Sequence, residues 1–278
     1  MDQKKIKSQK TAIISNERVA KGHFVMRLES QEIASGACPG QFVTVKAGRD
    51  ATDPLLRIPL GIHKIGQKDF SLLYKVVGRG TRTLSRFVKD ESVDVLGPLG
   101  NGFPLEGGPV PGKSKVVIVS GGHGVAPLFA LAEYLRETRP QTKIKFLMGA
   151  CTAEEVLCVK ELEEMGISVG IATDDGTRGC RGFVTGLMEE EIKEKPARIF
   201  ACGPRAMLAE VARIAEREKI SASVSLDAYM ACGIGACLGC ALKTEEGYKL
   251  VCKDGPVFEA GEVLWKEAVQ ARQSCGCE

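Results

Sequence analysis

The sequence lacks long apolar runs and has no large excess of either charge. No stretch approaches the eighteen or more apolar residues that a transmembrane helix requires. The basic segment MDQKKIKSQK (1–10) is not followed by the apolar core of a secretory signal. The 38 Lys and Arg residues nearly balance 35 Asp and Glu residues, so the net charge of +3 provides no polybasic surface for nucleic acid. We therefore expect a cytoplasmic protein with neither a membrane nor a nucleic-acid partner.

Several catalytic constellations are also missing. The three histidines, His23, His63 and His123, are scattered along the chain and form no metal-binding pattern. No Ser-His-Asp set, no carboxylate pair and no Walker-type lysine loop can be recognised. We predict no catalytic acid, base or nucleophile in this chain.

The order of periodic segments predicts three domains. Residues 11–99 contain short β-rich runs separated by Gly, Pro, Asp and Asn, which is typical of a small antiparallel barrel. Beyond the Gly- and Pro-rich residues 100–115, strands alternate with helices, which favours a parallel sheet with crossover connections. In this region TAEEVLCVKELEEMG (152–166) is predicted as one helix. The predicted domains are a barrel (1–108), an α/β domain (112–225) and a cysteine-rich region without clear period (226–278).

Cysteine spacing is the most specific signal. Six of the eleven cysteines follow residue 231, and an odd number argues against a disulfide framework. CGIGACLGC (232–240) has the C-x4-C-x2-C spacing of plant-type ferredoxins, and one more cysteine follows after eleven residues. Structural zinc sites use two close cysteine pairs, whereas this segment has one, so zinc is the weaker alternative. The spacing predicts a 2Fe–2S cluster with four ligands: Cys232, Cys237, Cys240 and Cys252.

Glycines inside the cysteine segment support this prediction. Gly233, Gly235 and Gly239 allow the loop to curl so that backbone N–H groups face the sulfur atoms, which also tunes a cluster's reduction potential. Cys275 and Cys277 are close to the C-terminus, and we predict that they bind no metal.

A glycine-rich turn begins the predicted α/β domain. VVIVSGGHGVAPL (116–128) places Gly121, Gly122 and Gly124 between a strand and a helix. Glycine at such a turn lets the backbone approach a pyrophosphate, and the helix N-terminus favours anions. The last glycine of the full G-x-G-x-x-G pattern is missing, because Ala126 and Pro127 stand in its place. A tight turn without a ligand would look similar, but its position at the first parallel strand favours a dinucleotide site.

Two further turns follow predicted parallel strands, at the edge where open α/β sheets bind ligands. ACGPRAM (201–207) brings Cys202, Gly203 and Pro204 to this edge, where Cys202 is either beside a nicotinamide or simply a small buried residue. ATDDGTRG (172–179) brings Asp174 and Asp175, whose carboxylates would accept ribose hydroxyls and repel a 2′-phosphate. We expect NAD rather than NADP, with a solvated Asp-Gly turn as the alternative.

Two barrel segments, LLRIPLGIH (55–63) and LLYKVVGRGT (72–81), contain groups suited to a phosphate-bearing cofactor. Arg57 supplies charge, Gly80 and Thr81 supply N–H and O–H donors, and Tyr74 supplies an aromatic face. Taken alone, each segment is a strand followed by a turn.

A barrel, a dinucleotide-type α/β domain and a ferredoxin-like cysteine loop in this order resemble the ferredoxin–NADP reductase superfamily. LLYKVVGRGT, SGGHGVAPL (120–128) and MACGIGACLGCALKTEEGYKLVCKDGPVF (230–258) are similar to the electron-transfer subunits of dihydroorotate dehydrogenase B. The resemblance covers nearly the whole chain. It implies FAD, a 2Fe–2S cluster and NAD as cofactors, and a role in pyrimidine synthesis.

The resemblance also implies which residues hold FAD. The matching positions are Ile58, Pro59, Leu60 and Gly61 in one segment, Leu73, Tyr74 and Lys75 in a second, and Gly80 and Thr81 in a third. Many relatives have Arg-Pro-x-Ser where this chain has Ile58-Pro59-Leu60-Gly61. Arg57 would replace the missing arginine from one position away, but Gly61 offers no hydroxyl to the flavin.

The implied function is an electron relay. An FMN-containing catalytic subunit oxidises dihydroorotate, and electrons pass through the cluster and FAD of this chain to NAD⁺ within a hetero-oligomer, such as a heterotetramer. RIPL (57–60) is also similar to the small subunits of NADH-dependent ferredoxin–NADP oxidoreductases and sulfide dehydrogenases, which is the alternative function. An iron–sulfur redox sensor without turnover is an alternative of another class, but flavin and nicotinamide domains would be superfluous in it.

Overall fold

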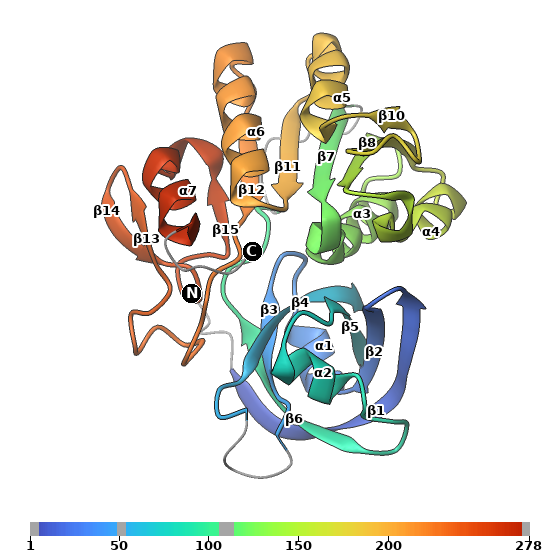
Figure 1. Ribbon diagram of the computed structural model, residues 1–278, viewed down its shortest axis with the longest axis vertical. Coiled ribbons are helices and arrows are strands. Elements are labelled where there is room, and N and C mark those ends of the chain that lie inside the picture. The colour runs from blue at the N-terminus through green and yellow to red at the C-terminus, as the bar shows by residue number, and fades with distance from the viewer. Residues whose placement is uncertain (1–5, 49–53, 106–113, 274–278) are drawn as a thin grey trace.

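A computed structural model describes residues 6–48, 54–105 and 114–273 of the chain. A barrel lies below an open sheet with helices on both faces, and the cysteine-rich region lies beside both (Figure 1). Cys275 and Cys277 lie outside the described residues. The described part contains no helix that is long and apolar enough to cross a membrane.

Six strands close the antiparallel barrel in the order β1-β2-β5-β4-β3-β6. A register shift in β1 between Ile13 and Ser15 bends this long strand. Large apolar side chains such as Met26, Phe70 and Leu72 fill the interior, so the barrel encloses a packed core rather than a channel. The strands are β1 (Lys7–Ala20), β2 (His23–Glu29), β3 (Phe42–Lys46), β4 (Ile58–Ile65), β5 (Asp69–Lys75) and β6 (Ser92–Leu99), with short helices α1 (Gln31–Gly36) and α2 (Arg79–Leu84).

The second sheet has the strand order β10-β9-β8-β7-β11-β12-β15, and it is parallel except for β15. The chain runs outward from β7 to β10 and then returns to β11 on the other side of β7, so the order reverses between β7 and β11. Ligands of open α/β sheets bind at such a switch point. The strands are β7 (Lys115–Gly121), β8 (Lys143–Ala150), β9 (Ser168–Thr173), β10 (Cys180–Arg181), β11 (Arg198–Cys202), β12 (Ala222–Ser225) and β15 (Val257–Glu259).

The helices of this sheet differ in how much of their surface is buried. Helix α3 (Val125–Thr138) is buried along most of its length, because it packs against both the sheet and strand β4 of the barrel.

The prediction of one helix over 152–166 is wrong: Cys158 has a left-handed φ of 60°, which separates η2 (Ala153–Glu155) from α4 (Val159–Glu164). The other helical segments are α5 (Val184–Glu191), α6 (Arg205–Glu218), η1 (Gly122–Gly124) and η3 (Ile192–Glu194).

The cysteine-rich region is not a separately packed unit. It contains the hairpin β13 (Ala241–Thr244) and β14 (Gly247–Leu250), η4 (Ala260–Glu262) and α7 (Trp265–Gln273). Its strand β15 pairs with β12, and its residues Cys240, Leu242 and Cys252 share one core cluster with the parallel sheet. The predicted barrel and parallel sheet are confirmed, whereas this pairing could not be read from the sequence.

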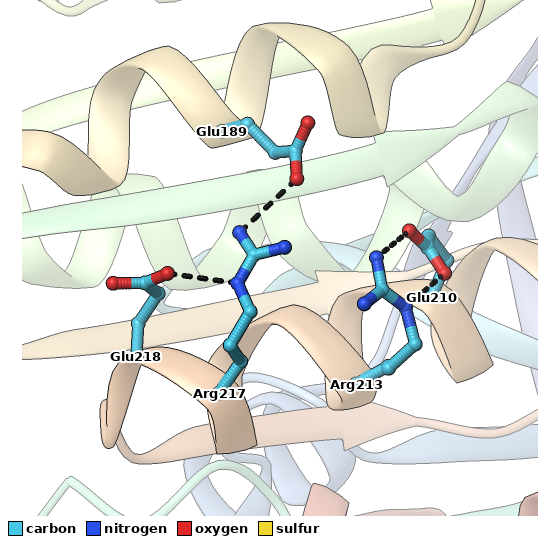
Figure 2. A network of polar contacts seen from close by, with 5 residues as sticks. All are labelled: Glu189, Glu210, Arg213, Arg217 and Glu218. Carbon is cyan, nitrogen blue, oxygen red and sulfur yellow. Dashed lines mark hydrogen bonds and ion pairs between the residues drawn. The ribbon is translucent and has the colours of Figure 1, made fainter.

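Arginine–glutamate pairs stabilise the α/β region in two different environments. On the surface, Arg217 of α6 contacts Glu189 of α5 at 3.1 Å, and Arg213 bonds to Glu210 of the same helix (Figure 2). In the interior, the buried Arg198 of β11 bonds to Ser223 of β12 and to Glu259 of β15. The buried Arg198 therefore joins the sheet to the cysteine-rich region through Glu259, whose side chain is half-exposed.

Replacing Arg198 by methionine is expected to destabilise the protein by about 2–3 kcal/mol, because the buried Ser223 hydroxyl loses its donor and Glu259 its counter-charge. Urea unfolding followed by circular dichroism measures the change. Arg213→Met is the matched control, and we expect little or no change from it because its ion pair is solvent-exposed. Equal effects of the two substitutions would contradict the role given to Arg198.

Candidate functional site

The cysteine loop packs directly on the barrel. Gly233 has a left-handed φ of 71°, and a Cβ atom added to it would lie 2.9 Å from Cγ2 of Thr44 in β3. Thr44 is paired with Pro59 of β4, one of the residues matched to the flavin segment. The close approach that glycine permits therefore brings the cysteine loop within one strand of the predicted flavin site.

Backbone N–H groups of this loop point at cysteine sulfur atoms. Sγ of Cys232 accepts from the N–H groups of Ile234, Ala236 and Cys237 at 3.3–3.5 Å. Sγ of Cys252 accepts from Gly235 at 3.1 Å. Such donors stabilise negative charge on sulfur and are typical around iron–sulfur clusters.

Among the four predicted ligands, Cys232 interacts most closely with Cys237 and Cys252 with Cys240, and a weaker interaction of Cys252 with Cys232 connects these two neighbouring pairs. In the described part of the chain, no three His, Cys, Asp or Glu side chains are grouped as a single metal ion would require. A 2Fe–2S cluster needs two cysteines on each of two iron atoms, so two neighbouring pairs fit it better than they fit one tetrahedral zinc ion.

The two pairs differ electrostatically. The N–H group of Ile234, with those of neighbouring residues, lowers the pKa of the Cys232 thiol to about 6. Burial raises the pKa of Cys252 to about 12. The thiolate form of Cys232 is therefore favoured by its backbone donors, whereas burial of Cys252 outweighs its one donor, Gly235, and disfavours the charged form.

At the switch point of the sheet, the turns after β7 and β11 touch. A Cβ atom on Gly124 would lie 2.2 Å from the carbonyl oxygen of Cys202, and one on Gly121 would lie 2.6 Å from Cδ of Pro204. Gly203 lies against Gly121 with similar closeness. The structure thus brings the two predicted nucleotide turns together, and only glycine permits this contact.

The remaining predicted nucleotide residues serve different purposes. Pro127 and Ala126 lie in the buried first turn of α3. The carboxylate of Asp175 accepts from the N–H and hydroxyl groups of Thr177, which lowers its pKa, so this side chain holds its own loop. Asp174 interacts with the thiol of Cys151 at the end of β8. Burial raises the pKa of Cys202 to about 12, so its thiol is neutral at the edge of the crevice.

Two of the flavin-matched segments, 58–61 and 80–81, lie against each other. Ile58 of β4 lies against α2, where a Cβ atom on Gly80 would be 2.7 Å from its Cδ1. At the other end of the segment, Gly61 lies against Pro127 of α3. The half-buried residues 58–61 therefore extend from α2 to the nucleotide turn, as a flavin that exchanges hydride with a nicotinamide requires.

Three side chains in these segments are already engaged. The Tyr74 ring is buried in the barrel core, and its hydroxyl donates to Asn16, so the expected aromatic face toward a cofactor is wrong. Arg57 is held by the carboxylate and carbonyl of Asp94 in β6, at 2.8 and 3.1 Å. Thr81 uses its hydroxyl to accept from the N–H groups of its own turn. Backbone groups must therefore provide much of the binding in these segments.

Residues 227–264 match the model of the iron–sulfur cluster binding domain of dihydroorotate dehydrogenase B, and residues 118–213 match the oxidoreductase NAD-binding domain. The dihydroorotate dehydrogenase B (NAD(+)) electron transfer subunit of Desulforamulus reducens is 38% identical over 255 residues, which cover 89% of this chain and 95% of that protein. This chain belongs to the family of dihydroorotate dehydrogenase B electron-transfer subunits. The corresponding protein of Geobacillus sp. is also 38% identical, over 93% of this chain and 99% of its own length.

Solved structures agree with the family assignment in fold. One reported for the NADH-dependent reduced ferredoxin–NADP oxidoreductase superposes with a TM-score of 0.82 at 29% identity, covering 94% of this chain and 91% of that one. The ferredoxin reductase of carbazole 1,9a-dioxygenase superposes with a TM-score of 0.65 at 19% identity, covering 77% of this chain and 67% of that one, and shows the fold alone. The dihydroorotate dehydrogenase B family member described here thus has a ferredoxin reductase-like fold with an iron–sulfur region at its end.

Several residues and contacts at the nucleotide edge of this family member were not predicted from the sequence. Phe183 follows β10 and is 79% exposed, and the cations Arg178 and Arg181 flank the same loop as Asp174. An exposed aromatic ring at this edge of the sheet suits the stacking of a base. Lys75, matched to the flavin segment, is paired with Glu155 at 2.5 Å and so links β5 to the loop after β8. These contacts join segments that are distant in the sequence, so only the folded structure shows them.

Gly61, where many family members carry serine, has room for a side chain. An added Cβ atom would lie 3.5 Å from Cδ of Pro127, an ordinary van der Waals contact. We expect Gly61→Ser to leave the thermal midpoint of unfolding unchanged or to raise it. FAD should dissociate about 2–10-fold more slowly, which is the effect expected from one added hydrogen bond. Gly61→Ala is the control for the Cβ atom alone. If alanine and serine retain FAD equally well, the hydroxyl has no role at this position.

Proposed function

We propose that the chain is the electron-transfer subunit of a dihydroorotate dehydrogenase B, which carries electrons from a catalytic subunit to NAD⁺. The contact of Gly233 in the cysteine loop with Thr44, the strand partner of Pro59, carries the proposal, because it puts the cluster ligands next to the flavin segment. Gly61 of the flavin segment also contacts Pro127, in the first turn of the helix that follows the nucleotide turn.

Each region of the chain then has one task. Bound FAD supplies the conversion between two-electron exchange with nicotinamide and one-electron exchange with the cluster. Residues 1–108 hold the flavin, residues 112–225 bind NAD at the touching turns of β7 and β11, and residues 226–278 hold the cluster through Cys232, Cys237, Cys240 and Cys252. The neutral thiol of Cys202 contributes no charge where hydride would pass.

The proposal includes an FMN-containing catalytic subunit that docks at the cysteine loop, in a hetero-oligomer such as a heterotetramer. Ile234 and Leu238 support this, because these apolar side chains of the loop are 48% and 64% exposed. None of the nine cysteines in the described part of the chain forms a disulfide bond, which agrees with a reducing cytoplasm as the location of the complex.

Leu238→Asp is expected to weaken association with the catalytic subunit at least about tenfold, because it places a charge at the centre of the proposed apolar contact. The left-handed φ of 60° at Leu238 is tolerated by aspartate, so the loop should keep its conformation. Surface plasmon resonance with the catalytic subunit measures the effect. Val88→Asp, at a barrel residue that is 61% exposed, is the control, and an equal loss from it would contradict docking at the loop.

The solved structure with 29% identity favours a second candidate, the flavin and iron–sulfur subunit of an NADH-dependent ferredoxin–NADP oxidoreductase. One experiment separates the two functions. The chain is purified with its catalytic partner, and the complex is assayed for dihydroorotate-dependent reduction of NAD⁺ and for ferredoxin-dependent reduction of NADP⁺. A complex that contains flavin and iron but reduces no NAD⁺ with dihydroorotate would reject the first proposal.

A further inference from the structure

A cavity of about 1230 Å³ lies between the barrel and helices α3 and α4. It is enclosed by the outer face of barrel strands β1, β2, β4 and β5 on one side and by helices α3 and α4 on the other. Of the residues assigned above to the flavin, the nucleotide or the cluster, Leu73 lines it, whereas residues 58–61, 80–81, 121–124, 202–204 and the cysteine loop do not. The cofactors of the proposed function therefore leave most of this cavity unexplained.

Four carboxylates that form no direct ion pair within the described residues lie in its lining. Glu17 of β1, Glu133 and Glu137 of α3 and Glu161 of α4 face the cavity, and within residues 6–48, 54–105 and 114–273 none of them forms an ion pair. Burial raises the pKa of Glu133, the nearby ammonium of Lys64 opposes this shift in part, and the neighbouring Glu137 adds a smaller upward contribution. The two glutamates of α3 are one helical turn apart, so their repulsion is relieved when a cation lies between them.

The other charged groups do not neutralise this lining. Asp69 is engaged by Arg27 in a bidentate pair at 2.8 and 2.9 Å, and the ammonium of Lys64 lies 4.7 Å from the ring centroid of Phe129. His63 is neutral, because burial lowers its pKa to about 4. The lining contains five carboxylates (Glu17, Asp69, Glu133, Glu137, Glu161) and two cations (Arg27, Lys64). Its net charge is therefore −3, whereas the whole chain carries a net charge of +3. The cavity therefore repels nucleotides and acidic substrates and attracts cations.

A buried hydroxyl in the same wall requires a partner. Ser71 of β5 is buried, and its Oγ has no hydrogen-bond partner in the described part of the chain. Its neighbours Phe70 and Leu72 point into the barrel core, so Ser71 points outward to the cavity that it lines. A buried hydroxyl without a partner is costly, and a ligand that carries N–H donors would satisfy it.

Between these polar groups the walls are apolar, with Val25 and Leu73 from the barrel and Ala130 and Leu157 opposite. A hydrated metal ion would not use these walls, whereas a chain of methylene groups would. We propose that the cavity binds a linear aliphatic polyamine, whose ammonium groups bond to Glu133, Glu137 and Ser71 and whose methylene groups lie on Val25 and Leu73.

A bound polyamine joins the two halves of the molecule, because Ser71 and Glu17 belong to the barrel and Glu133 and Glu137 belong to α3. The floor of the cavity contains His63 of β4, which donates from Nδ1 to the carbonyl oxygen of Ala126 at 3.4 Å. Ala126 lies in the first turn of α3, directly after the nucleotide turn. Binding therefore stabilises the contact between β4 and α3, which also positions the flavin-matched strand relative to the nucleotide turn.

The test uses the full chain loaded with FAD and iron, titrated with spermidine at low ionic strength by isothermal calorimetry. We expect saturable binding of one spermidine, a rise in thermal midpoint, and weaker binding as salt is added. The double variant Glu133→Gln/Glu137→Gln should bind at least tenfold more weakly. Ser71→Val should also bind about tenfold more weakly while unfolding at the same or a higher temperature, because it removes an unsatisfied buried hydroxyl.

The matched control is Glu163→Gln/Glu164→Gln, which removes the same charge from α4 at residues that do not line the cavity. Its affinity for spermidine should stay within twofold of the original. An equal loss in this control would show a general attraction to an acidic surface and overturn the proposal. So would the absence of saturable binding, or Mg²⁺ binding as tightly as spermidine at the same residues.

Discussion

Gly124→Ala should abolish NADH oxidation by this chain, with a loss of at least about 100-fold. The added Cβ atom would meet the carbonyl oxygen of Cys202 at 2.2 Å, its carbonyl carbon at 2.6 Å and the nitrogen of Gly203 at 2.9 Å. All three are backbone atoms, which cannot move aside as the end of a side chain can. The turns after β7 and β11 must therefore separate, and a displacement of about 1 Å at a reacting pair costs about two orders of magnitude in rate.

The same clash should lower the free energy of unfolding by about 3 kcal/mol. Gly186 in helix α5 provides the control, because no atom lies within 4 Å of a Cβ added there. Gly186→Ala should keep full activity and gain stability, since alanine favours a helix over glycine. NADH oxidation with ferricyanide, measured well below both thermal midpoints, separates loss of the site from loss of the fold. Kinetics in Gly124→Ala that match those of Gly186→Ala would show that the two turns do not form the nucleotide site.

Features that are local in the sequence were predictable. The C-x4-C-x2-C spacing fits within nine residues, and the glycines at 121, 122 and 124 lie between one strand and the helix that follows it. Such motifs impose their geometry on the chain without help from distant residues. The alternation of strands and helices after residue 115 likewise predicted the parallel sheet, because crossover connections allow few other arrangements.

Features that depend on which strands pair, or on strands that are buried on both faces, could not be predicted from the sequence. The residues of β5 are buried on both faces, so alternation could not show that Tyr74 points into the barrel and Leu73 toward α3. The helical pattern of 152–166 contains no proline or glycine before its end, and the left-handed Cys158 breaks it nonetheless. Tertiary packing decides both outcomes, as it decides the pairing of β15 with β12.

The hydrogen-bond partners of side chains are a third kind of feature, which the sequence does not predict. Arg57 was a reasonable substitute for the arginine of relatives, yet Asp94, thirty-seven residues away, holds it. The carboxylate of Asp175 was expected to contact a ribose, but it bonds to Thr177 within its own loop. A sequence motif names the residue types present, whereas the free donors and acceptors depend on which neighbours have already used them.

Cys252→Ser is expected to stop electron transfer from the catalytic subunit to NAD⁺ while NADH oxidation with ferricyanide continues. Serine is a poor ligand for iron compared with a thiolate, and Cys252 is buried beside Cys240, so no solvent-exposed group can replace it. Electrons from the partner must then bypass the cluster, and we expect the rate of the coupled reaction to fall at least about 100-fold. Iron analysis and the visible spectrum of the purified variant measure the loss of cluster directly.

Cys38→Ser is the control, because this half-buried cysteine precedes β3 and lies outside the predicted ligand set. It should keep its iron and both activities. The contrast between the two reactions of Cys252→Ser is what distinguishes a relay from a structural metal. If the cluster only stabilised the fold, both reactions would decline together with the thermal midpoint. If it carries the electrons, NADH oxidation survives, because Gly61, Pro127 and the turns of β7 and β11 pack together without contribution from the cysteine loop.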